Sequence, residues 1–231
     1  MRIGPAARSS ILLALCASLV AFAVEAEAKP KARPTARRAT GAAYRAHVLR
    51  WHAKDDAARA PLDAQGRPKL VLENINTKER VELEALGDGG GFSEAERARA
   101  TSVLRDTHRG GDRAADAELL DLLYRLQRHF DAPCVRVVSA YRAGGASQHA
   151  RGRAADIVLP GVDDAKLAAY ARSLGNTGVG LYPRSGFVHV DVRESPHYWV
   201  DSSGPGERSR PVKQKKPAKK VARKSPRPGV R

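Results

Sequence analysis

The pattern of apolar and polar positions divides the middle of the chain into short elements. The runs "KLVLEN" and "ERVELEAL" are β-rich and flank Asn76–Lys78, which predicts a hairpin. Ser93 followed by Glu96 is a capping-box pattern, so a helix is expected to begin there. In "ADAELLDLLYRLQRHF" four leucines fall along one helical face, which predicts a core helix.

The next region continues the alternation of helices and strands. "VRVVSAY" favours a strand, and "DDAKLAAYARSL" a helix with acidic residues at its start. "GVGLY" and "FVHVDV" favour two strands of a hairpin, separated by Pro183 and Gly186. Helices before and between the strands of an antiparallel sheet indicate an α+β fold.

Upstream of this body, Tyr44, Val48 and Trp51 fall at i, i+4 and i+7. This spacing predicts a short amphipathic helix, and packing on the main body is its expected role. The residues before this helix, from Lys29 to about Ala43, are rich in Pro, Ala, Arg and Lys and favour a disordered linker.

Residues 1–28 have the composition of a signal peptide. Two arginines precede an apolar run from Ile11 to Val24, and small residues then offer a cleavage site after Ala28. The run is short for a transmembrane helix, although an uncleaved anchor is the alternative. We therefore expect export to the periplasm or cell wall, with no stable membrane span after cleavage.

The net charge of +16 is concentrated at the two ends of the chain. Residues 68–201 are nearly neutral, with eighteen basic and nineteen acidic side chains. The flanking segment 29–67 has ten basic against three acidic residues, and 202–231 has eleven against one. We expect one folded domain over 68–201, a basic linker over 29–67 and a disordered basic tail over 202–231.

Cysteine usage adds one further expectation. Removal of the signal leaves Cys134 as the single cysteine, so no internal disulfide can form. Cys134 leads into the strand "VRVVS", and we interpret it as a small core residue.

Candidate chemistry first appears in "SQHARGRAADI". His149 and Asp156 are seven residues apart, too far to share an ion in a regular helix or strand. They can share a site only if the chain turns back, and Gly152 permits such a turn. In "GFVHVDV", strand alternation places His189 and Asp191 on one face and the valines on the other.

Each of these pairs alone is compatible with an ordinary polar surface. Together, two imidazoles and one carboxylate match the ligand set of a catalytic zinc, with a fourth position left for water. A zinc-bound water can attack an amide without a protein nucleophile. The combination therefore favours a metal centre.

The motifs "SAYR", "SQHARGRAADI", "GVGLY" and "GFVHVDVR" resemble those of the zinc D-Ala-D-Ala peptidases, and most closely the murein endopeptidase K-like family. The resemblance covers roughly residues 68–201. It implies a compact hedgehog/DD-peptidase fold, a Zn2+ cofactor and peptidoglycan as the substrate. The resemblance favours endopeptidase over carboxypeptidase activity, although nothing in the residues alone separates the two. An exported, non-catalytic, zinc-stabilised wall-binding domain is the alternative function.

The resemblance also assigns roles to residues. It implies that His149, Asp156 and His189 bind the metal, and that Arg142 faces the substrate carbonyl or carboxylate and stabilises negative charge. Ser147 is expected to help orient the site.

One position departs from the family pattern. Many relatives have an acidic general base three residues before the last metal ligand, where this chain has Gly186. Asp191 is the substitute base that the sequence offers, and orientation of an imidazole is its alternative role. His197 and Trp199 are candidates to line the substrate groove, or else to pack at the sheet edge.

The basic arms suggest a further partner. They can raise the local concentration of the protein near anionic wall polymers through long-range attraction, or act only as solubilising tails. A third hypothesis is a secreted polyanion-binding protein whose arms matter more than its core. No aromatic residues are interleaved for base stacking in the tail, so no specific nucleic acid is expected.

Overall fold

The computed structural model describes residues 41–205 and 207–209. The predicted signal peptide, the linker up to residue 40 and most of the predicted tail lie outside the described residues. Within the described part no helix is long and apolar enough to cross a membrane.

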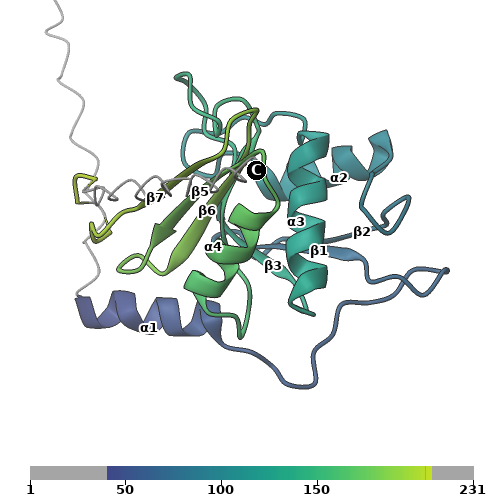
Figure 1. Cartoon of the computed structure of the whole chain (residues 1–231), viewed down its shortest axis with the longest axis horizontal. Coiled ribbons are helices and arrows are strands. Elements are labelled where there is room, and N and C mark those ends of the chain that lie inside the picture. Colours follow the sequence, from purple (N-terminus) through teal and green to yellow (C-terminus); the bar gives the residue numbers. More distant parts are fainter. Residues whose placement is uncertain (1–40, 206, 210–231) are drawn as a thin grey trace, which may run out of the picture. The chain divides into compact units, whose positions relative to one another are not determined.

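A seven-stranded sheet with the order β2-β1-β3-β4-β6-β5-β7 forms the centre of the described domain (Figure 1). Neighbouring strands are antiparallel except for the pairs β1–β3 and β5–β7, which are parallel. The predicted α+β class is confirmed, with a mixed sheet. The strands are β1 (Leu70–Asn74), β2 (Arg80–Leu83), β3 (Val135–Ser139), β4 (Ala154–Val158), β5 (Thr177–Tyr182), β6 (Phe187–Val192) and β7 (His197–Val200).

Four described helices accompany the sheet, and three of them begin at the polar residues expected of helix caps. The Ser93 side chain accepts a hydrogen bond from the Glu96 backbone N–H at 3.2 Å, as the capping-box pattern predicts. Asp116 and Asp163 cap the next two helices in the same way. The helices are α1 (Gly41–His52), α2 (Glu94–Leu104), α3 (Ala117–His129) and α4 (Asp164–Ser173).

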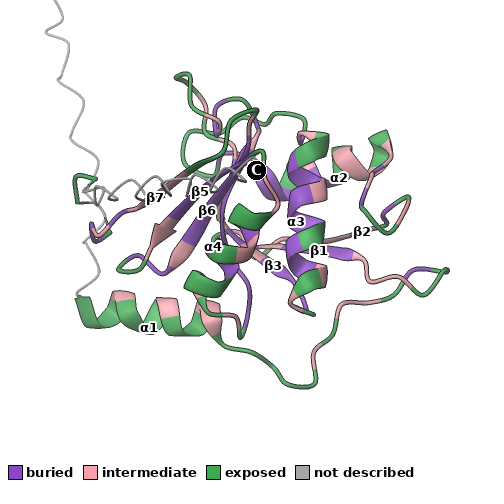
Figure 2. Ribbon diagram, viewed as in Figure 1, coloured by how far each residue is buried: buried purple, intermediate pink, exposed green. Residues whose placement is uncertain are grey.

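The hydrophobic core lies between the sheet and helices α2, α3 and α4 (Figure 2). Leucines of α3 pack against the valines of β6, which occupy the face that alternation predicts. Cys134 is a free, buried thiol, and burial raises its pKa to about 11. It is therefore protonated at neutral pH, in keeping with the interpretation as a core residue.

Helix α1 is largely exposed, and its first residue, Gly41, lies inside the stretch expected to be a disordered linker. The predicted contact with the main body is present, because the Tyr44 hydroxyl donates to the Ser185 carbonyl oxygen at 2.7 Å. This helix packs on the β5–β6 turn and on β3, and its last residue, His52, lies 3.6 Å from the carboxylate of Asp164 at the start of α4.

Strands β4 and β7 were not among the elements expected from the sequence. Every residue of β4 is buried, so "AADIV" lacks the alternation that marks a half-exposed strand. The two strands extend the sheet on both sides of the β5–β6 hairpin, and both carry candidate site residues.

Candidate metal centre

Strand pairing brings two of the predicted metal ligands face to face. Asp156 of β4 and His189 of β6 are directly opposite in the antiparallel register. Side chains at such positions leave the same face of the sheet and start about 5 Å apart. Their meeting is therefore fixed by the backbone rather than by flexible side chains.

The third predicted ligand comes from the loop between β3 and β4. Gly152 adopts a φ of 71° and donates its backbone N–H to the His149 carbonyl oxygen at 3.1 Å. The loop turns back here, as the separation of His149 and Asp156 requires. The His149 Nδ1 lies 2.6 Å from the Ala140 carbonyl oxygen, so this nitrogen is the protonated donor and Nε2 is left to face the cluster.

The three side chains converge on one point. The Asp156 Oδ1 is 2.9 Å from His189 Nδ1 and 3.4 Å from His149 Nε2, and the two ring nitrogens are 3.1 Å apart. A tetrahedral ion with bonds of about 2.0–2.1 Å separates its ligand atoms by roughly 3.3–3.4 Å. The donor set and its spacing therefore fit a zinc ion with little rearrangement.

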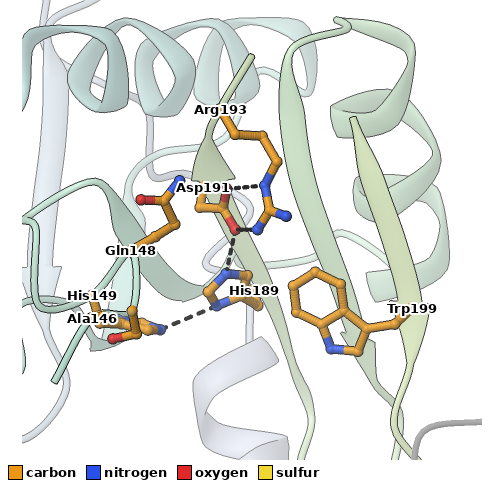
Figure 3. A pocket seen from close by; sticks show the side chains of 8 residues that line it. Ala146, Gln148, His149, His189, Asp191, Arg193 and Trp199 are labelled. Carbon is orange, nitrogen blue, oxygen red and sulfur yellow. Dashed lines mark hydrogen bonds and ion pairs between the residues drawn. The ribbon is translucent and has the colours of Figure 1, made fainter. Parts of the chain in front are cut away.

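A buried carboxylate holds the far side of the His189 ring. The Asp191 Oδ2 is 2.9 Å from His189 Nε2, and Arg193 binds both oxygens of this carboxylate, with Nε 2.6 Å from Oδ1 (Figure 3). Nε2–H of His189 donates to Asp191, so the lone pair of Nδ1 points at the cluster. This arrangement fixes the tautomer that a metal ligand needs.

Charges within this network shift the pKa values of its members. Burial opposes ionisation of Asp156, but its close polar contacts with the His149 and His189 rings outweigh this effect and hold the pKa below its usual range. Burial likewise opposes the charge on Asp191, yet His189 and Arg193 lower the pKa to about 2. For His189 burial favours the neutral ring, while the two carboxylates raise its pKa. Both carboxylates are therefore ionised at neutral pH.

Two glycines of β5 make room for the network, and their role was missed in the sequence. Gly178 is opposite Asp191, and a Cβ there would overlap the Asp191 carboxylate and the Arg193 guanidinium. Gly180 is opposite His189, and a Cβ there would overlap the Trp199 indole. Glycines at i and i+2 of a strand were the available signal for such close approach.

The predicted substrate-facing arginine lies at the edge of the cluster. Arg142 forms an ion pair with the Asp156 Oδ2, and its Nε donates to the Ser139 hydroxyl at 2.9 Å. Its side chain is half exposed. One end of the guanidinium thus binds a candidate metal ligand, and the remainder faces solvent.

A hollow of about 380 Å³ opens over His149 and His189 (Figure 3). Ser147 and Trp199 line it, and the Ser147 hydroxyl accepts the Ala150 backbone N–H at 3.2 Å. Gln148 is a lining residue that the sequence reasoning missed. Its Nε2 donates to the Val192 carbonyl oxygen, and its buried Oε1 has no partner among the described residues.

The remaining candidate, His197, lies outside this lining. It is exposed and its ring stands 5.4 Å from the Trp199 ring, between centroids. Trp199 itself lies 5.1 Å from the His189 ring and donates from Nε1 to the Tyr182 hydroxyl at 3.1 Å. Trp199 therefore borders the cluster directly, and His197 extends that aromatic side outward.

The structure explains why this chain has a glycine where the family pattern has an acidic general base. Gly186 lies in the β5–β6 turn at a φ of 69°, and a Cβ there would overlap Val48 of α1. Among the described residues that line the hollow, Asp191 has the single carboxylate, and both of its oxygens are already bound. No acidic side chain occupies the place that the family pattern gives to the base.

Two buried imidazoles and one buried carboxylate beside a hollow define a candidate mononuclear metal centre of the hydrolytic type. The chain belongs to the family described as Peptidoglycan L,D-endopeptidase MepK, whose sequence model matches residues 63–198. The resemblance drawn from the motifs is thereby confirmed, and all three candidate ligands fall within the match.

Curated relatives give the same result. The chain is 32% identical over 148 residues to Peptidoglycan L,D-endopeptidase MepK of Escherichia coli strain K12, a match that covers 57% of this chain and 81% of the relative. It is 31% identical over 139 residues to the Probable peptidoglycan L,D-endopeptidase MepK of Haemophilus influenzae, covering 53% and 74%. No solved structure matches the chain significantly.

Proposed function

We propose that this chain is an exported, zinc-dependent murein peptidase that hydrolyses amide bonds in peptidoglycan cross-links or stem peptides. The observation that carries the proposal is the convergence of His149, Asp156 and His189 on one point beside an open hollow. The relatives named as peptidoglycan L,D-endopeptidases support the substrate and favour cleavage within a cross-link over removal of a terminal residue.

In this proposal His149 Nε2, His189 Nδ1 and Asp156 Oδ1 hold the metal. Bound zinc supplies an activated water and polarises the scissile carbonyl. The hydrogen bonds from His149 to the Ala140 carbonyl and from His189 to Asp191 keep both rings in place, with their lone pairs directed inward.

Asp191 acts in this scheme as a positioning residue. Its carboxylate meets His189 on the ring nitrogen away from the cluster, and Arg193 occupies both oxygens. A general base has to reach the attacking water, and that side of the ring faces away from it. The geometry supports the orienting role over the role of base.

Arg142 and the lining residues act on the substrate. The exposed part of the Arg142 guanidinium is placed to stabilise negative charge that develops on the scissile carbonyl oxygen. Ser147 and Trp199 border the hollow and are placed to contact the substrate. His197 extends the aromatic side of the groove beyond Trp199.

Export and the basic arms complete the proposal. Residues 1–28 direct the chain to the periplasm or cell wall, where its substrate is located. The basic segments 29–67 and 202–231 attract anionic wall polymers by long-range, salt-sensitive forces. Their charge and the peptidoglycan named in the relatives support this role.

Absence of an acidic residue at Gly186 favours a second candidate, a zinc-stabilised wall-binding domain without catalysis. Digestion of purified cross-linked muropeptides by the full chain separates the two. The peptidase reading expects one zinc per chain and a new amine from the cleaved cross-link, both lost in His189→Ala. Stoichiometric zinc and wall binding without any released amine would establish the binding domain instead.

A further inference from the structure

A second hollow lies on the same face of the sheet as the candidate metal centre. It measures about 630 Å³, and its walls come from α1 and from the β1 and β3 side of the sheet. Arg136 of β3 pairs with Val158 of β4, and Val158 is two residues beyond Asp156. Residues at i and i+2 of a strand share a face, so Arg136 and Asp156 point to the same side.

Helix α1 is fixed across this face at both of its ends. The Arg136 guanidinium donates to the backbone carbonyls of Arg50, Trp51 and Ala53 at 2.7–3.2 Å, which satisfies the open end of the helix. At the other end the Tyr44 hydroxyl holds the β5–β6 turn at Ser185. The C-terminal end of the helix meets this turn as well, because the His52 Nε2 lies 3.2 Å from the Gly186 carbonyl oxygen.

This position makes α1 one wall of the hollow. His47, Arg50 and Trp51 of α1 face Ile75 and Lys78 of the β1–β2 hairpin across it. The hollow overlies β1 and β3, and β3 is the strand next to β4, which carries Asp156. Helix α1 lies outside residues 63–198, the part that matches the family model.

The lining has an excess of positive charge. Arg136 forms an ion pair with Glu73 at 3.7 Å. Arg50 and Lys78 are the two further cationic side chains of the lining. Within residues 41–205 and 207–209, no carboxylate forms an ion pair with either of these two side chains. The Arg50 guanidinium lies 2.8 Å from the Nδ1 of His47. Two cations thus face a hollow that also offers the apolar surfaces of Trp51 and Ile75.

We propose that this hollow, between α1 and the β1–β3 strands, is a subsite that binds a carboxylate-bearing stem peptide of the substrate. Arg50 and Lys78 pair with its free carboxylates, and Trp51 and Ile75 cover its aliphatic part. The inference rests on the proposed function, because it assumes that a cross-linked peptide lies across the sheet face. The metal centre then lies between this subsite and the Trp199 side.

The test compares two double variants that remove the same side-chain types. Arg50→Gln with Lys78→Gln changes the hollow, whereas Arg45→Gln with Lys166→Gln changes exposed cations outside it. With a cross-linked muropeptide that has free stem carboxylates, we expect the first variant to raise KM roughly 3- to 30-fold. The effect should fall on KM rather than kcat and disappear when the same carboxylates are amidated. The control variant should match the wild type.

The experiment distinguishes failure of the subsite proposal from failure of the proposed function. Equal KM values for the two double variants, or an effect that survives amidation, would overturn the subsite while cleavage by the wild type keeps the proposed function. Absence of cleavage by the wild-type chain would remove the proposed function and the subsite with it.

A second measurement does not depend on catalysis. The chain has two tryptophans, so Trp199→Phe leaves Trp51 as the single fluorophore of this type. We expect a cleaved muropeptide with free carboxylates to change Trp51 emission, at concentrations that rise when Arg50 and Lys78 are also replaced by Gln. Unchanged Trp51 emission at concentrations that inhibit cleavage by the Trp199→Phe variant itself would contradict the proposal.

Discussion

Both faces of strands β4 and β6 are buried, one by apolar packing and the other within a network of polar contacts. On one face Ile157, Val188 and Val190 are 0% exposed and pack in the apolar core. On the other face Asp156 and His189 are only 4% and 7% exposed, yet hydrogen bonds and ion pairs surround them. Burial of charged groups costs free energy that their partners only partly offset, whereas the apolar face gains free energy from burial. The difference indicates that the apolar face stabilises the fold, whereas stability alone does not account for the polar face.

Substitution of two adjacent residues of β4, one on each face, tests this difference most directly. We expect Asp156→Asn to abolish stoichiometric zinc binding and reduce cleavage to background, because an amide is a poor metal ligand. We expect Ile157→Ala to lower the free energy of unfolding by about 2–5 kcal/mol while the folded protein still binds one zinc. Metal analysis and chemical denaturation measure the two effects. Retention of zinc by the first variant, or its loss from folded protein in the second, would show that the faces are not separable.

A smaller loss of zinc binding is expected for Asp191, which contacts the candidate ligand His189. Asp191→Asn keeps the shape of the side chain but weakens its hold on His189, and we expect a 10- to 100-fold loss of zinc affinity. Competition with a chelator measures this affinity. If Asp191 were instead the general base, kcat would collapse while zinc affinity stayed at the wild-type value. Arg193→Gln, which reaches His189 only through Asp191, should change affinity less.

The polar face was predictable from the sequence as far as local periodicity reaches. Alternation in "FVHVDV" separated His189 and Asp191 from the valines, and the turn at Gly152 made a site shared by His149 and Asp156 possible. Strand β4 was missed because it is buried on both faces and shows no alternation. Its identity as a strand depends on neighbours that are distant in the chain.

The supporting residues were not predictable for the same reason. Gly180 is required only because Trp199 lies over it, and Gly186 because Val48 of α1 lies against it. The Tyr44–Trp51 spacing indicated a helix and its contact with the body. Its position across the site face depends on the Arg136 guanidinium, a tertiary contact that no local pattern contains.

The smallest expected effect is on the pH dependence of the free energy of unfolding, which arises from buried polar contacts and not from the apolar core. Asp106 is buried and accepts backbone N–H groups from Arg109, Ala143 and His108 at 2.8–3.0 Å. These hydrogen bonds, against the effect of burial, lower its pKa to about 2. Ala143 follows Arg142 directly, so Asp106 anchors the loop that places this arginine beside Asp156 at the candidate metal centre.

A carboxyl group whose pKa is lower in the folded state stabilises the fold above its unfolded value of about 3.9. This stabilisation is lost as the pH falls from about 4 towards 2. We therefore expect Asp106→Asn to reduce the pH dependence of the free energy of unfolding in this window, measured by urea denaturation at a series of pH values. Asp112→Asn, which removes an exposed carboxyl from the same loop, is the control and should keep the wild-type slope. The apolar face has no group that titrates in this range, so a wild-type slope in Asp106→Asn would mean that another polar contact, and not this loop anchor, couples the fold to acid.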